Sequence, residues 1–178
     1  MKTRWPWMSG MLVALLLTAS CKKGMLDVNE EFYVETNITV NGNDPAFVGQ
    51  QLLDASATSE MINKYANTIK SIEILEVKYY LSYFNGSATQ QINDGILQVA
   101  DANGEGIYDI ATLANVNLMA ATTESSLAFD QQAVDRLSDL IKNDPHSAMI
   151  YLRGTVNETP VDFTVKVRFR VKMVAGVL

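Results

Sequence analysis

The chain has 178 residues, the usual size of one domain, and a formal net charge of −6 from 14 Lys and Arg against 20 Asp and Glu. This acidic balance argues against a nucleic-acid-binding protein, because the phosphate backbone rewards a basic surface. One histidine and one cysteine leave too few clustered ligands for a zinc site.

The first 20 residues have the layout of a secretory signal peptide. Lys2 and Arg4 form a short positive region, residues 11–17 (MLVALLL) carry no polar side chain, and the small residues 18–20 follow. The apolar run is shorter than the roughly 20 residues that a bilayer-spanning helix needs. We therefore expect residues 1–20 to be a cleaved signal rather than a membrane span.

The end of this segment, LTASC, resembles the lipobox of bacterial lipoproteins, although Thr18 stands where that family prefers Leu. The resemblance implies cleavage before Cys21 and diacylation of its sulfur, with residues 21–30 as a tether. It also implies a place in the bacterial cell envelope, anchored by lipid to the outer membrane and facing either the periplasm or the surface. Ordinary cleavage after Ser20, which leaves a free thiol, is the alternative.

Strand patterns dominate residues 31–178, which we expect to form one domain. The clearest covers 163–173, where odd-numbered apolar residues alternate with Thr, Lys and Arg. Weaker patterns predict strands at 32–40, 47–54, 71–84, 92–100, 110–120 and 148–156. Seven strands with turn signals between several of them predict an all-β fold, a two-sheet antiparallel sandwich that is immunoglobulin-like or related.

Two local features refine this prediction. In the strand 71–84 the apolar face shifts by one position between Ile74 and Leu75, which indicates a β-bulge. Two short helices are also expected, one with Ser59 as its N-cap and one that begins at Asp130 and stops before Pro145.

Two longer stretches carry a second resemblance. SEMINKYANTIKSIEILEVKYYLSYFNG and LRGTVNETPVDFTVKVRFRVKMVA are similar to segments of uncharacterised lipoproteins of bacterial cell envelopes. These are structural patterns without catalytic motifs. The resemblance therefore implies a fold and not an activity.

Residues 101–112 (DANGEGIYDIAT) contain the candidate metal ligands. Oxygen-bearing side chains occupy positions 1, 3, 5 and 9 of an EF-hand-like calcium loop, namely Asp101, Asn103, Glu105 and Asp109. Position 12 should be a bidentate Glu and is Thr112, and no helical pattern enters the loop. We expect a hairpin loop with positive φ at Asn103-Gly104 and Gly106 and no cofactor, with calcium binding as the alternative.

The sequence does not favour an enzyme. His146 is the only histidine and follows Pro145 in a predicted loop, where we expect it to be solvated rather than catalytic. No G-x-S-x-G motif occurs at a strand–helix turn. The carboxylates Glu73 and Glu76 straddle the predicted bulge and are expected to face water.

Two groups of side chains are candidates for binding. Tyr80 and Phe84 project from one face of the strand 71–84, where they either pack in the core or at an edge, or stack against sugar rings. Four basic residues form a ladder along the last strand: Lys166, Arg168, Arg170 and Lys172. We expect this ladder to pair with acids on neighbouring strands and to protect an exposed sheet edge, with an anionic lipid or an acidic partner as the alternative.

These observations predict a lipid-anchored envelope protein that presents a non-catalytic β-sandwich as a binding or structural module. Its one implied partner is the membrane, reached through the lipid. The alternative is a cell-surface module for glycan binding or calcium-dependent adhesion. The sequence does not identify the protein or glycan that the domain would bind.

Overall fold

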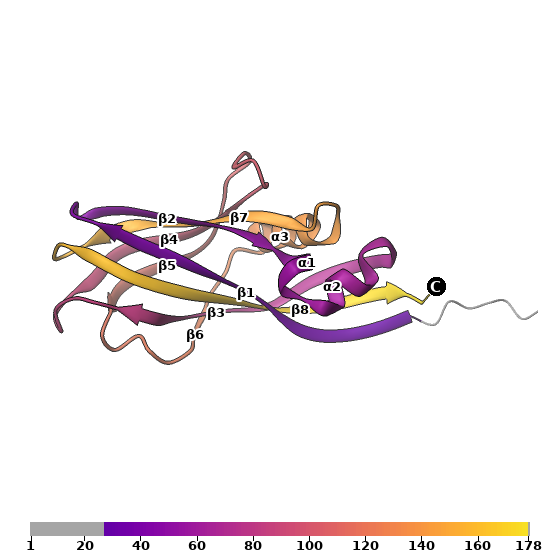
Figure 1. Cartoon of the computed structure of the whole chain (residues 1–178), viewed down its shortest axis with the longest axis horizontal. Coiled ribbons are helices and arrows are strands. Elements are labelled where there is room, and N and C mark those ends of the chain that lie inside the picture. The colour runs from indigo at the N-terminus through magenta and orange to yellow at the C-terminus, as the bar shows by residue number, and fades with distance from the viewer. Residues whose placement is uncertain (1–26, 178) are drawn as a thin grey trace, which may run out of the picture.

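The computed structural model describes residues 27–177, which form a sandwich of two four-stranded antiparallel sheets (Figure 1). Sheet A has the order β1 (Asp27–Gly42), β8 (Val161–Gly176), β3 (Ile69–Phe84), β6 (Ser125–Leu127). Sheet B has the order β2 (Ala46–Asp54), β7 (Ser147–Val156), β4 (Gln91–Ala100), β5 (Tyr108–Asn117). The predicted sandwich and its seven strands are confirmed. The three-residue β6 was not expected.

The strand orders 1-8-3-6 and 2-7-4-5 define a jelly roll, one of the related sandwiches that the prediction left open. Each sheet interleaves strands from both halves of the chain. β1 pairs with β8 along its whole length, from Asp27 opposite Gly176 to Gly42 opposite Val161. This pairing includes residues 27–30, which were expected to belong to the tether.

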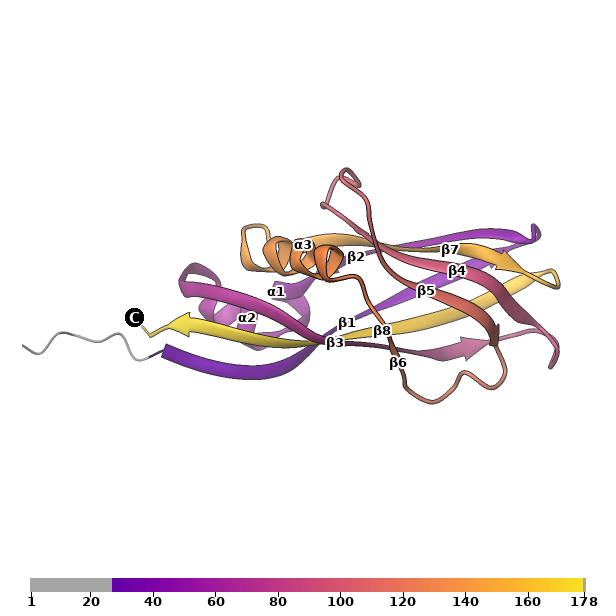
Figure 2. The same ribbon diagram turned by 180° about the vertical axis from the view of Figure 1, so that it is seen from behind.

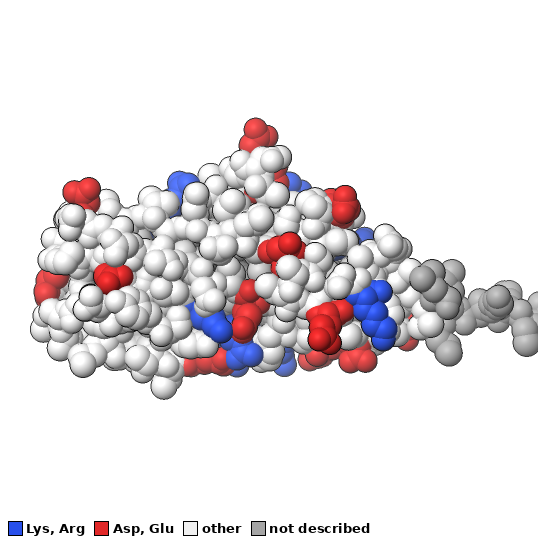
Figure 3. Space-filling model, viewed as in Figure 1, with Lys and Arg blue, Asp and Glu red and all other residues white. Residues whose placement is uncertain are grey.

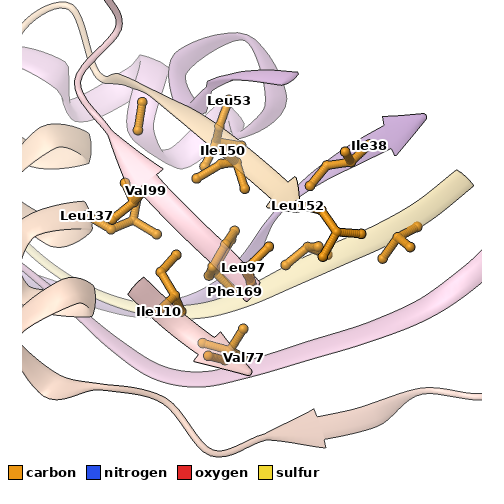
Figure 4. Close-up of a cluster of buried hydrophobic side chains, with 14 of the residues drawn as sticks. Ile38, Leu53, Val77, Leu97, Val99, Ile110, Leu137, Ile150, Leu152 and Phe169 are labelled. Carbon is orange, nitrogen blue, oxygen red and sulfur yellow. The ribbon is translucent and has the colours of Figure 1, made fainter. Parts of the chain in front are cut away.

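The core lies between the two sheets and is built from alternate side chains of each strand (Figure 4). In β8 the odd-numbered residues point inward, and Phe163 and Phe169 are fully buried. Phe163 meets the ring of Phe47 edge-to-face, with the centroids 5.5 Å apart. Ile38, Leu97 and Ile150 fill the same layer from β1, β4 and β7.

Four short helical segments connect the strands: α1 (Ala55–Thr58), α2 (Glu60–Tyr65), the 3-10 turn η1 (Ala66–Thr68) and α3 (Gln131–Lys142). The predicted caps are confirmed, since Ser59 accepts a hydrogen bond from the Ile62 N–H at 3.4 Å and Asp130 accepts one from Ala133 at 3.0 Å. The apolar face of α3 packs against β3 and β5 and covers one side of the sandwich (Figure 2). The separate helix α1 was not expected.

The sandwich is elongated and has two different ends (Figure 1). Asp27 and Gly176 are paired at what we call the terminal end, together with α2. The turns β1–β2, β3–β4 and β7–β8 lie at the opposite, far end. The two ends are joined by β1, β3 and β8, which have 16 residues each and therefore span about 50 Å.

Candidate functional site

The predicted lipidation site, Cys21, lies outside the described residues. Asp27 follows it by six positions and begins β1 at the terminal end. Within residues 27–177, no helix is both long and apolar enough to cross a membrane.

The β4–β5 loop holds three of the four candidate calcium ligands. The Asp101 carboxylate accepts hydrogen bonds from the backbone N–H groups of Asn103 at 3.0 Å and Glu105 at 2.9 Å. Gly104 and Gly106 have φ values of 85° and 63°, so the predicted positive φ at these glycines is confirmed. Asp101 thus stabilises its own turn, as expected for a hairpin loop.

The fourth candidate ligand, Asp109, lies in β5 and accepts a hydrogen bond from Gln98 Nε2 at 2.6 Å. In the part of the chain that the structure describes, no three His, Cys, Asp or Glu side chains gather as a possible metal site. The three acidic candidates, Asp101, Glu105 and Asp109, therefore do not gather as a possible metal site in the described residues.

The structure separates the candidate binding residues Tyr80 and Phe84. The predicted bulge at Leu75 is confirmed, but a second register shift follows between Leu81 and Tyr83. This shift turns Tyr83 outward and Phe84 inward, where Phe84 packs against the core opposite Phe163. Tyr80 remains on the outer face, opposite Lys166. The outward neighbour of Tyr80 is therefore Tyr83 and not Phe84.

The outer face of sheet A is charged over the half nearest the terminal end. The registers of β1, β8 and β3 give three rows across the sheet: Glu31–Lys172–Glu73, Tyr33–Arg170–Glu76 and Glu35–Arg168–Lys78. Acids on β1 and β3 thus flank the basic residues of β8. Figure 3 shows the red and blue atoms side by side along the lower part of the molecule.

Ion pairs connect these rows. Glu35 lies 3.1 Å from Lys166 Nζ and 3.3 Å from Arg168 Nε, and Glu124 pairs with Arg168 from the β5–β6 loop. The Arg168 guanidinium also lies 4.1 Å from the centre of the Tyr33 ring. Hydrogen bonding to Glu35 raises the pKa of Lys166, and bonding to Glu124 raises the pKa of Arg168.

The predicted pairing of the basic ladder is therefore confirmed for Lys166, Arg168 and Arg170, but its expected role at a sheet edge is wrong. β8 is an inner strand of sheet A, between β1 and β3. The alternation of β8 is equally compatible with an edge and an inner strand, because both bury one face. Only the pairing of β8 with both neighbours distinguishes the two positions.

Two further rows of this face carry less charge. They are Asn37–Lys166–Tyr80 and Thr39–Thr164–Tyr83, towards the far end. Tyr83 is 50% exposed, and its hydroxyl donates to Asp162 at 3.1 Å. That bond raises the pKa of Tyr83 and holds its ring on the surface. We call Asn37, Thr39, Tyr80, Tyr83, Thr164 and Lys166 the tyrosine platform.

The only histidine is buried, so the expectation that it is solvated is wrong. His146 is 8% exposed, and its Nδ1 lies 2.8 Å from the Ile141 carbonyl oxygen. Its own carbonyl accepts a hydrogen bond from the Ala55 N–H at 2.9 Å. His146 thus joins the end of α3 to the start of α1, which the local sequence could not reveal.

A polar cluster fixes the loops of the far end. Gln90 is 2% exposed and donates through Nε2 to the carbonyls of Glu158 at 2.7 Å and Pro160 at 2.9 Å. The Glu158 carboxylate accepts from the Ser87 and Thr89 hydroxyls, each at 2.6 Å. No sequence motif marked this cluster, because its members meet only when the β3–β4 and β7–β8 turns come together.

Two surface cavities do not have His146 in their walls. One of about 510 Å³ runs beside β5 and is bordered by Ile110 and Asp130. Another of about 340 Å³ lies between the β4–β5 loop and α3, with Arg136 and Asp144 in its wall. Neither brings a nucleophile, a general base and an oxyanion-binding group together.

Comparisons with known proteins add little to this description. No family model matches the chain, and no curated protein matches it either. Among solved structures, the chain is similar to one titled Desmodium yellow mottle tymovirus, with a TM-score of 0.37 and 8% sequence identity. That match covers 85% of this chain and 90% of the other. At this TM-score, the function must be inferred from the chain itself.

Proposed function

We propose that this protein is a non-catalytic binding or structural module that a lipid on Cys21 holds at the outer membrane of a bacterium. The observation that carries the proposal is the position of Asp27 at one end of the long axis, six residues after a cysteine in a lipobox-like sequence. Six residues span at most about 20 Å. The lipid would keep the terminal end near the bilayer and the far end about 50 Å away from it.

The contribution of the anchor would be local concentration. A single acyl chain gives only marginal membrane binding, whereas two or three hold a protein durably. Confinement to a membrane raises the effective concentration of a domain for partners on the same surface. Such a module needs an accessible face and no catalytic group, and the burial of His146 agrees with this.

Metabolic labelling tests the anchor. The full chain is expressed in a bacterium that processes lipoproteins, fed an alkyne-bearing palmitate and partitioned with a detergent. We expect label and detergent-phase recovery for the wild type, and loss of both for Cys21→Ser. Thr18→Leu, which supplies the residue that the lipobox family prefers, should label at least as strongly as the wild type. A free thiol on Cys21 in the native protein would contradict the proposal.

Glycan binding is a second candidate, and the tyrosine platform favours it. Tyr80 and Tyr83 lie on neighbouring rows of the outer face of sheet A, beside the hydroxyl and amide groups of Thr39, Thr164 and Asn37. Tyr83 is exposed and Tyr80 is half-buried. Accessible aromatic rings next to neutral hydrogen-bonding groups suit the apolar faces and hydroxyls of a sugar. Calcium has no part in this proposal, because the candidate ligands are not gathered.

A screen of neutral glycans on an array tests this second candidate. Tyr83→Ala and Tyr80→Ala should each lower any binding at least tenfold. Tyr108→Ala, which removes an exposed tyrosine from sheet B, is the matched control and should leave binding unchanged. Equal losses in all three variants, or binding that Tyr83→Ala leaves intact, would contradict a site on the platform.

A further inference from the structure

The outer face of sheet B differs sharply from that of sheet A. Its outward positions form four rows: Leu52–Met149–Ala100, Gln50–Tyr151–Gln98–Asp109, Val48–Arg153–Ile96–Thr112 and Ala46–Thr155–Asp94–Ala114. We call this surface face B. Three of these 15 positions are charged, against eight of nine in the three charged rows of sheet A. Val48 is 62% exposed and Leu52 43%.

The centre of face B contains polar atoms without partners. Arg153 stacks over the Tyr151 ring at 4.8 Å, yet no carboxylate pairs with it among residues 27–177. Arg153 Nε and Gln98 Oε1 are both buried. Within residues 27–177, Arg153 Nε donates no hydrogen bond and Gln98 Oε1 accepts none. Buried polar groups are almost always satisfied in native proteins. The Nε atoms of Arg136, Arg168 and Arg170 also lack a hydrogen bond, but Arg168 and Arg170 each lie beside carboxylates, whereas Arg153 has no carboxylate partner in the described chain.

We propose that face B is the interface of a homodimer, covered by face B of a second copy. A two-fold interface must be self-complementary. If one residue of the first copy contacts a different residue of the second, the same contact also forms with the two copies exchanged. Face B carries both halves of such a contact. Arg153 needs a carboxylate, and Asp94 lies one row away on the adjacent strand. The Asp94 carboxylate accepts a hydrogen bond from the Thr155 hydroxyl but has no cationic partner in the described chain.

A two-fold axis parallel to the strands, between β7 and β4, brings these groups together. Sheets packed face to face lie about 10 Å apart. Rotation about this axis places β7 of one copy over β4 of the other, so Arg153 faces Ile96 and lies within reach of Asp94. The same rotation sets the exposed Val48 and Leu52 of β2 towards the β4–β5 side of the partner copy.

That side of the partner offers a matching apolar surface. Ile107 and Tyr108 are 44% and 37% exposed at the end of the β4–β5 loop, which rises from sheet B (Figure 2) and covers Tyr151 of face B with Gly104. The parallel arrangement also leaves both terminal ends on the same side of the dimer. Two copies can therefore pair while each stands on the same membrane, although the interface itself does not require the lipid.

The size of face B points to a weak dimer. Four strands about 4.8 Å apart and about nine residues long cover roughly 570 Å² as a flat area, to which side-chain relief and the loop add. Standard interfaces remove about 800 Å² from each partner, and weaker ones about 600 Å². We therefore expect association at tens to hundreds of micromolar rather than at nanomolar concentration.

Sedimentation equilibrium tests the proposal. The protein is purified as residues 21–178 and carries Cys21→Ser, so that no lipid is attached. We expect a concentration-dependent dimer between about 5 and 500 µM. Arg153→Asp and Asp94→Arg should each weaken the dimer at least tenfold, and the double exchange should restore most of the affinity. Lys64→Asp, an identical change of charge on α2, is the control and should have no effect.

A monomer at every concentration overturns the proposal, and so does a dimer that tolerates Arg153→Asp. Single losses without rescue in the double variant overturn the two-fold pairing of Arg153 with Asp94. If Arg153→Asp fails to fold by circular dichroism, Val48→Asp, at a 62% exposed position, replaces it and must also weaken the dimer.

Discussion

Glu158 illustrates how one side chain can join two loops that are distant in the sequence. Its carboxylate accepts hydrogen bonds from Ser87 and Thr89, and these bonds hold the pKa of Glu158 below its ordinary value. A carboxyl whose pKa is lowered in the folded state stabilises that state above its unfolded pKa of about 4.3. This stabilisation is lost as the pH falls through the folded pKa.

The double substitution Ser87→Ala and Thr89→Ala tests this relation. We expect the pKa of Glu158 to rise towards that of an unperturbed glutamate, because both donors to its ionised form are removed. An NMR titration of the side-chain carboxyl carbons measures the change. Ser71→Ala removes an exposed hydroxyl elsewhere and should leave this titration unaltered.

Gly154 is a residue that no sequence pattern singled out. A Cβ at this position would lie 2.1 Å from the Asp94 carbonyl oxygen and 2.9 Å from the Gly95 Cα, because β7 and β4 approach closely where two glycines oppose each other. Backbone atoms of a paired strand cannot move aside as a flexible side chain can. Only glycine therefore fits in this place.

We expect Gly154→Ala to lower the free energy of unfolding by about 1–3 kcal/mol, the usual effect of overpacking. Urea denaturation followed by circular dichroism measures it. Gly42→Ala provides the control, since a Cβ there would meet nothing within 4 Å, and its effect should stay within about 0.5 kcal/mol. Equal stabilities of the two variants would contradict the close approach of β4 and β7.

Among the elements, β3 shows what the sequence can and cannot predict. The bulge at Leu75 was predictable, because the apolar positions before and after it, such as Ile74 and Val77, fall on opposite phases. The second bulge was hidden, because Tyr83 and Phe84 are both aromatic and either could continue the buried face. Pairing with Thr164 and Phe163 decides which of them points inward.

The same limit applies to the order of the strands. Alternation predicted seven strands and one buried face for each, but it contains no information about neighbours. It therefore did not show that β8 is an inner strand of sheet A, nor that acids from β1 and β3 would flank its basic residues. The prediction that Tyr80 and Phe84 share one face of β3 was wrong for a related reason, because a bulge exchanges the faces of all residues beyond it.

A comparison of Phe84→Ala with Tyr83→Ala tests the second bulge. Phe84 packs against the core, so its truncation should cost about 2 kcal/mol of unfolding free energy, less than for a fully buried ring. Tyr83 is 50% exposed, and its truncation should cost about 0.5 kcal/mol. Denaturant unfolding of both variants measures the difference. A larger loss of unfolding free energy for Tyr83→Ala than for Phe84→Ala would mean that Tyr83, and not Phe84, packs in the core.

At the scale of the molecule, each surface has a different composition. Sheet A presents ion pairs and the tyrosine platform, face B presents aliphatic side chains around Arg153, and the terminal end carries the connection to Cys21. In a jelly roll whose 16-residue strands run from one end to the other, an anchor at the terminal end leaves both sheet faces accessible. The module would therefore stand on the membrane rather than lie on it.

Energy transfer to the bilayer tests this orientation. A fluorophore is attached to the lipidated protein at Asn67→Cys in η1 or at Asp44→Cys in the β1–β2 turn, both exposed, and the vesicles carry an acceptor lipid. Acylation of Cys21 leaves the new cysteine as the one free thiol. The two sites are separated by about the length of β1, roughly 50 Å, so transfer should be strong from Asn67→Cys and weak from Asp44→Cys. Equal transfer from both sites would mean that the long axis lies along the membrane, which would cover one of the two sheet faces.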